Sequence, residues 1–131
     1  MALGTVLATA ALTAPAVAQE TPIITASLTG DATLVAKGAA VDVRVLYSCS
    51  SDATSALISV SLTQRVAGGR LAKGSAFTRD LVCDGAERTA TVRVIGDAIA
   101  FKKGDAAAQG SMEACISFCS FVALSGTVRV R

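Results

Sequence analysis

Apolar and polar side chains alternate along several short segments of this chain, and a period of two is typical of strands that bury one face. In the segment 41–49, Val41, Val43 and Val45 fall on one face, while Asp42 and Arg44 fall on the other. The same alternation runs through 58–65, 90–94 and 122–130, and less regular strands fit 23–28, 76–83 and 106–115. The pattern therefore predicts about seven short strands.

Clusters of turn-forming residues separate these segments. They are Gly30-Asp31, Lys37-Gly38, Ser50-Ser51-Asp52, Gly68-Gly69, Asp84-Gly85, Gly96-Asp97 and Lys103-Gly104-Asp105. Short strands spaced by turns predict an all-β fold, and we expect an antiparallel immunoglobulin-like sandwich of about seven strands with two disulfides. A closed barrel is the alternative.

The four cysteines constrain this fold further. If consecutive strands alternate in direction, Cys49, Cys83, Cys115 and Cys119 all lie at one end of the domain. Strand parity places Cys115 and Cys119 on the outward face of a tight hairpin, where opposed residues are close enough for a disulfide. That pairing leaves Cys49 with Cys83. A bridge from Cys49 to Cys115 would copy the inter-sheet disulfide of antibody domains, but the tryptophan that usually packs on that bridge is absent.

An apolar, alanine-rich leader precedes the domain. Ala16 and Ala18 occupy the small-residue positions that a signal peptidase requires, so we expect a signal peptide at 1–18 and one β-sandwich domain at 19–131. A buried first helix or strand is the alternative. No other stretch approaches the roughly 18 apolar residues of a membrane helix, so we expect no transmembrane segment and a secreted protein.

The composition disfavours several classes of function. A net charge of +2 is too small to indicate a nucleic-acid partner, and aromatic residues make up only 4% of the chain. The chain has no histidine, which removes Ser-His-Asp and Cys-His arrangements. Bridged cysteines leave no thiolate, and the acidic residues lack the spacing of a calcium loop. We therefore expect no metal site, no cofactor and no enzymatic activity.

Two groups of charged residues are candidate sites. Asp52, Asp84 and Glu87 fall in loops at the cysteine end, where a carboxylate pair would support glycoside hydrolysis, but ordinary turn chemistry accounts for them. Basic residues gather at the opposite end and would attract an anionic polymer or phospholipid, although solubilising charge is the simpler interpretation. These residues are Lys37, Arg70, Lys73, Lys102 and Lys103.

The hairpin offers the best candidate for binding. Ile116, Phe118 and Phe121 surround the expected Cys115–Cys119 bridge, and exposed apolar side chains at a loop tip favour a binding site. A lid over the end of the core is an equally simple interpretation. We expect a monomeric, secreted, non-enzymatic binding or surface-interaction module for a small apolar ligand or an extracellular protein. The alternative is a secreted protease inhibitor that presents a basic loop, either 69–71 or 101–103.

Several runs also resemble a known group of proteins. They are Tyr47-Ser48-Cys49, residues 60–65, Cys83-Asp84-Gly85, residues 91–94 and residues 101–106. Together they resemble a family of small secreted actinobacterial immunoglobulin-like proteins of unknown function. A weaker likeness is to the neocarzinostatin-type apoproteins, which are secreted immunoglobulin-like sandwiches with two disulfides, one of them across a short hairpin. Binding of an enediyne chromophore would follow from that likeness only by analogy of fold.

Overall fold

A computed structural model describes residues 20–131, and the expected signal peptide at 1–18 lies outside the described residues. Seven strands and two short 3-10 turns make up the described part of the chain. Their bounds are β1 Ile24–Val35, η1 Ala36–Gly38, β2 Ala40–Cys49, β3 Ser55–Arg65, η2 Ala67–Gly69, β4 Leu71–Thr78, β5 Arg88–Ile95, β6 Gly104–Cys115 and β7 Cys119–Val130. The expectation of an all-β fold of seven strands with two disulfides is confirmed.

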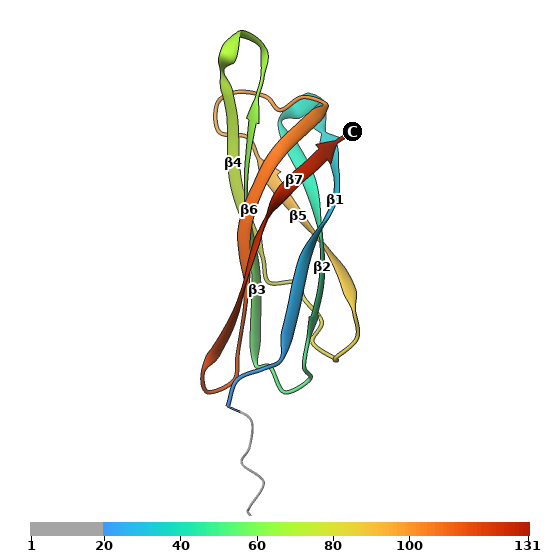
Figure 1. The fold of residues 1–131 in the computed structure, drawn as a ribbon, viewed down its shortest axis with the longest axis vertical. Helices are drawn as coiled ribbons and strands as arrows, with labels where there is room; N and C mark the ends of the chain where they lie inside the picture. Colours follow the sequence, from blue (N-terminus) through green and yellow to red (C-terminus); the bar gives the residue numbers. More distant parts are fainter. Residues whose placement is uncertain (1–19) are drawn as a thin grey trace, which may run out of the picture.

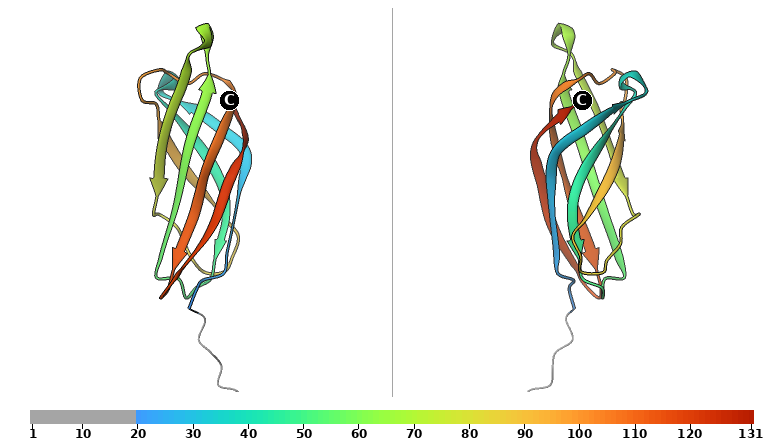
Figure 2. Two further views of the ribbon diagram at one scale, coloured as in Figure 1. Left: turned by 60° about the vertical axis from the view of Figure 1, so that its left-hand side comes forward. Right: turned by 90° about the vertical axis from the view of Figure 1, so that its right-hand side faces the viewer.

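All seven strands belong to one hydrogen-bonded sheet in the order β4-β3-β6-β7-β1-β2-β5. The strands run lengthwise around an elongated body (Figures 1 and 2). The two outermost strands come together where Gly74 of β4 bridges to Gly96, just after β5. The sheet therefore curls almost into a barrel, and its hydrogen bonds do not divide the strands into the two separate sheets expected of a sandwich.

The sheet is mixed, so the expectation of a purely antiparallel arrangement is wrong. β1 pairs with β2 in the antiparallel sense, but Asp31 and Ala32 of β1 lie parallel to Arg129 and Val130 of β7. The register of the β1–β2 pair shifts between Leu28 and Ala32. Gly30, with φ of +86°, lies inside this bulge, in a conformation that favours glycine. Gly30-Asp31 was expected to be a turn between strands, and it is instead the point at which β1 bends.

The alternation of side chains is confirmed along the best-predicted strands. Val41, Val43 and Val45 are fully buried, whereas Arg44 between them is exposed. Inward residues of the other strands complete the core, among them Ile58, Val60, Leu62, Val92, Val94, Met112, Leu124, Val128 and Val130. Burial of these apolar side chains, chiefly valine, isoleucine and leucine, supplies the main stabilising free energy of such a domain.

One predicted strand is wrong. The segment 76–83 was expected to form a strand that ended at Cys83, but β4 spans Leu71–Thr78 and Cys83 lies in the loop that leads to β5. Its period-two pattern begins earlier, because Ala72 and Gly74 face the core and Lys73 and Ser75 face outward. A strand rich in small residues has a weak hydrophobic signal, which explains the error.

The cysteines pair as expected. Cys49 is bonded to Cys83 across 34 positions, and Cys115 is bonded to Cys119 across 4. Both bridges lie at the end of the body where β2 and β6 finish, at the bottom of Figure 1. The long bridge holds the β4–β5 loop against the core, and two hydrogen bonds assist it. The Val82 N–H donates to the Tyr47 hydroxyl at 2.9 Å, and the Gly85 N–H donates to the Cys49 carbonyl at 2.8 Å.

The opposite end is closed by a loop rather than by a disulfide. Phe101, on the connection from β5 to β6, is almost completely buried, and its N–H donates to the Gly38 carbonyl at 2.8 Å. The buried side-chain amide of Gln64 binds the main chain of Lys102, the residue after Phe101. It donates to the Lys102 carbonyl at 2.7 Å and accepts from the Lys102 N–H at 2.8 Å. These bonds satisfy a buried amide that would otherwise destabilise the fold.

The two disulfides should differ in their contribution to stability. In the chain-entropy treatment, loss of the Cys49–Cys83 bridge costs about 4 kcal/mol and loss of the Cys115–Cys119 bridge about 2 kcal/mol, because the first closes the longer loop. Urea unfolding of the Cys49→Ala/Cys83→Ala and Cys115→Ala/Cys119→Ala variants measures the difference. Equal losses would contradict the assignment of the long bridge as the main covalent support.

Gly38 should tolerate no side chain. Its φ is +95°, and a Cβ here would collide with the Phe101 carbonyl oxygen. Gly85 is a matched control, because its φ is +80° and a Cβ there would meet nothing within 4 Å. Both Ala variants carry a backbone cost of about 1 kcal/mol. We expect Gly38→Ala to lose at least about 2 kcal/mol more, since the loop that carries Phe101 must move. Similar losses in thermal unfolding would contradict this packing.

Candidate functional site

The hairpin between β6 and β7 is held on both sides. The Thr54 N–H donates to the Cys115 carbonyl at 2.8 Å, on the β3 side. On the β1 side, the Phe118 N–H donates to the Glu20 carbonyl at 3.1 Å, and the Ser120 hydroxyl donates to the Pro22 carbonyl at 2.7 Å. Together with the disulfide, these bonds make the turn a rigid support for its apolar side chains.

The three candidate residues of this hairpin have different environments. Ile116 is half-buried, Phe118 is 62% exposed at the turn, and Phe121 is 68% exposed on β7. Phe121 stands directly opposite Glu113 of β6, so its ring is on the outward face of the sheet. Phe118 instead belongs to the turn, where its main chain contacts the segment that precedes β1. The proposed role of all three in ligand binding stays a prediction.

The outward side chains of β4, β3, β6 and β7 form a second feature, which we call the outer face. Phe77 of β4 is opposite Ser59, Ser59 is opposite Ser111, and Ser111 is opposite Ala123. Phe121 precedes Ala123 by two residues and so shares its face. Phe77 and Phe121 are therefore separated by three strand spacings and by two residues along the strands, roughly 16 Å between their main chains.

The outer face is hollowed beside Phe77. Ser59, Ser61, Ser75 and Phe77 line an open depression of about 460 Å³. The Ser59 and Ser111 hydroxyls are 3.4 Å apart, and one donates to the other. Because the serines are short, the depression has a floor of hydroxyl groups and a wall of aromatic ring, a combination suited to a flat ligand with a few polar groups.

A smaller hollow continues the outer face toward the disulfides. It has a volume of about 130 Å³, and its lining includes Leu57, Arg79, Glu113 and Cys115. The Arg79 guanidinium lies 5.7 Å from the centre of the Phe77 ring, within the range of a cation–π contact. The hollow therefore combines an apolar side chain with one positive and one negative group.

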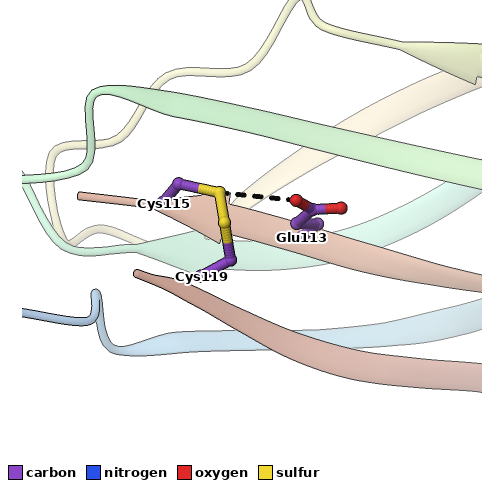
Figure 3. A group of neighbouring side chains, drawn as sticks. All are labelled: Glu113, Cys115 and Cys119. Atoms are coloured by element: carbon purple, nitrogen blue, oxygen red, sulfur yellow. Dashed lines mark hydrogen bonds between the residues drawn. A yellow bond between two sulfur atoms is a disulfide. The ribbon is translucent and has the colours of Figure 1, made fainter. Parts of the chain in front are cut away.

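Glu113, Cys115 and Cys119 lie together on the outer face (Figure 3). Their potential ligand atoms fall within 4.8 Å of one another. The Glu113 carboxylate oxygen is 3.4 Å from the Cys115 sulfur, but a disulfide sulfur carries no hydrogen to donate, so this is a close contact rather than a hydrogen bond. Metal coordination by cysteine requires thiolates, and both sulfurs are oxidised. The group is thus a disulfide cross-link that lies beside the carboxylate of Glu113.

The carboxylates considered for catalysis take part in local turns. Asp52 accepts a hydrogen bond of 2.6 Å from the Ser50 hydroxyl. Asp84 accepts from the Ala86 N–H at 3.0 Å and forms an ion pair with Arg88. Hydrogen bonds from Arg88 and from the Ala86 N–H lower the pKa of Asp84 to about 2. These contacts are those of turn-stabilising residues.

The loops weighed for protease inhibition lie far from both disulfides. Arg70 follows η2 at the tip of the β3–β4 hairpin, at the top of Figure 1, and Lys102 is held by Gln64 at the same end. The hairpin tip contains Gly68 and Gly69, both with positive φ. No covalent link among the described residues supports either loop, and the inhibitor alternative stays a prediction.

Sequence reasoning missed Phe77, Ser59 and Ser111 as parts of a site. Phe77 falls in the misplaced strand 76–83, and neither serine was singled out within the predicted strands 58–65 and 106–115. Their alternation with apolar neighbours was a usable signal, but the order of the strands in the sheet was needed to place them side by side. Comparison with family models, with curated proteins and with solved structures finds no match for this chain.

The Asp84–Arg88 pair should make stability depend on pH. The pKa of Asp84 lies near 2 in the folded protein against an ordinary value of 3.8, so the unfolded chain binds the proton more tightly. The stabilisation is present above about pH 4 and is lost as the pH falls toward 2. In Asp84→Asn, the melting temperature should fall less over this range. Asp80→Asn is the control for removal of an exposed carboxylate at the same end, and equal behaviour of both variants would contradict the prediction.

Proposed function

We propose that the protein is a secreted, non-enzymatic binding module whose outer face takes a small, flat, largely apolar ligand. The observation that carries this proposal is the exposure of phenylalanine. Of the four phenylalanines in the chain, only Phe101 is buried, and the other three are more than 60% exposed. Large apolar side chains are among the most often buried, so an aromatic ring kept in water on a rigid strand favours a role in binding.

The arrangement of two of these rings favours a ligand between them. Phe77 and Phe121 come from the outermost strands of the outer face, and Ser59, Ser111 and Glu113 lie on the two strands between them. An aromatic ligand in contact with such rings gains about 0.5–1.5 kcal/mol for each pair beyond the area that it buries. Polar substituents of the ligand would reach the serine hydroxyls or the Arg79 and Glu113 side chains. Phe118, at the turn, would extend the apolar contact for a larger partner such as an extracellular protein.

We further infer that the curled sheet corresponds to an immunoglobulin-like sandwich. The outer face would be one layer, and β1, β2 and β5 would be the other, joined where β1 lies parallel to β7 just beyond its bulge. Membership of the small secreted actinobacterial family is proposed on the residue runs that resemble it, among them Tyr47-Ser48-Cys49 and Cys83-Asp84-Gly85. Two disulfides among the described residues support an oxidising compartment. No helix in the part of the chain described by the structure is long and apolar enough to cross a membrane.

Fluorescence titration with 8-anilinonaphthalene-1-sulfonate, an aromatic dye with one sulfonate group, tests the site. Phe121→Ala and Phe77→Ala should each weaken dye binding about five- to tenfold, because each removes one aromatic contact. Ser111→Leu should also weaken binding, since it fills the space between the rings. Ile95→Ala is the control, because Ile95 is 65% exposed but belongs to β5 and lies outside the outer face.

Two outcomes would contradict the proposal. Dye affinity that is unchanged in Phe77→Ala, Phe121→Ala and Ser111→Leu would exclude the outer face as the binding surface. An equal loss in Ile95→Ala would indicate nonspecific adsorption to exposed apolar groups. Loss of binding only in Phe118→Ala would move the site from the outer face to the hairpin turn.

A further inference from the structure

Charge is separated along the long axis of the molecule. The end opposite the disulfides, which we call the basic end, comprises η1, the β3–β4 hairpin tip, the β5–β6 connection and the end of β7 (Figure 1). Its basic residues are Lys37, Arg65, Arg70, Lys73, Lys102, Lys103, Arg129 and Arg131. Against these eight stand three acidic residues, Asp31, Asp97 and Asp105, so the side chains carry a formal surplus of five positive charges.

The cysteine end has the opposite sign. Its acidic residues are Glu20, Asp52, Asp80, Asp84, Glu87 and Glu113, and its basic residues are Arg79 and Arg88. Six acidic against two basic residues leave a formal surplus of four negative charges. Between the ends, Arg93 forms an ion pair with Asp42 through two hydrogen bonds of 2.8 and 3.0 Å. Arg44 is the remaining charged residue of this middle part and adds one positive charge. The small net charge of +2 is therefore the sum of a positive end and a negative end.

The positive charges of the basic end are available to a partner. All eight side chains are exposed, and of these eight only Arg129 has an ion-pair partner among the described residues, namely Asp105 at 3.1 Å. Lys103, Arg129 and Arg131 also line an open hollow of about 360 Å³, large enough to admit a phosphate group. Arg and Lys side chains that converge on such a hollow are suited to phosphate oxygens.

Exposed aliphatic side chains accompany the charges. Ile95 is 65% exposed at the end of β5, and Leu71 is 40% exposed at the start of β4. Both lie at the basic end, where Ile95 is opposite Ala40 and Leu71 is opposite Arg65. Basic and aliphatic side chains together are the composition that binds an anionic lipid interface, because charge draws the protein to the headgroups and the apolar groups enter them.

We propose that the basic end docks on the surface of a membrane that contains anionic phospholipid. In this orientation the cysteine end points away from the bilayer, because its negative surplus is repelled by the same lipids. The outer face with Phe77 and Phe121 runs between the two ends and stays open to solution. Attraction of this kind is screened beyond about 8 Å at physiological salt, so docking requires direct contact by the basic end.

Sedimentation with lipid vesicles tests the proposal on the purified chain. We expect binding to vesicles of phosphatidylcholine that contain phosphatidylglycerol, no binding to phosphatidylcholine alone, and weaker binding as salt is raised. Each basic residue near an anionic bilayer tightens binding about fivefold, so the charge reversal Lys103→Glu should weaken it about 25-fold. Arg79→Glu is the matched control, because it changes the net charge equally at the cysteine end and should alter binding less than about twofold.

Four outcomes would overturn the proposal. The first is absence of binding to anionic vesicles, and the second is equal binding to neutral vesicles. The third is an equal loss of vesicle affinity in Lys103→Glu and Arg79→Glu. The fourth is binding of soluble polyphosphate by a protein that does not bind anionic vesicles. The last result would assign the basic end to a soluble phosphate polymer. Circular dichroism of both variants confirms that each reversal leaves the fold intact.

Discussion

The bulge in β1 is the constraint on which the rest of the structure depends. β1 pairs with β2 on both sides of the bulge, and just beyond the bulge its other edge lies parallel to β7. It therefore joins β2 and β5 to β7, β6, β3 and β4. The backbone must bend sharply to do so, and Gly30 provides a conformation that other residues rarely adopt. Without this bend, the strands on either side of β1 would have no continuous ladder between them.

Closure of the sheet then creates two ends with different chemistry. At one end, two disulfides and the Tyr47 hydroxyl hold the loops in place. The hairpin between β6 and β7 therefore keeps its shape although its phenylalanine side chains are exposed to solvent. At the other end, Gln64 and Phe101 hold the connection from β5 to β6 from within, and the outer positions are left to basic residues. Because the core supplies most of the stability, the exposed residues at the two ends can differ in charge and polarity without unfolding the domain.

Much of the architecture was accessible from the sequence because its signals are local. Alternation of Val41, Val43 and Val45 with polar residues predicted a half-buried strand, and parity along two strands predicted both disulfide pairings. The errors arose where the local signal was weak or misleading. Small residues in β4 concealed its start, and Gly30-Asp31 has the composition of a turn although it forms a bulge. The parallel contact of β1 with β7 joins residues nearly a hundred positions apart, which no local pattern specifies.

The sequence by itself determined the inward faces of the most regular strands and the scarcity of phenylalanine, and it favoured one disulfide pairing over its alternative, because these depend on strand parity and composition. Only the tertiary structure decided that Phe77 and Phe121 share one face with serines between them, because that depends on the order and register of four strands. Turn positions in the sequence already placed five basic residues at the end opposite the cysteines, and the structure added Arg65, Arg129 and Arg131 to them, because strand ends from different parts of the chain meet there. Local periodicity specifies which residues are buried, whereas a surface brings together residues from segments that are far apart in the sequence.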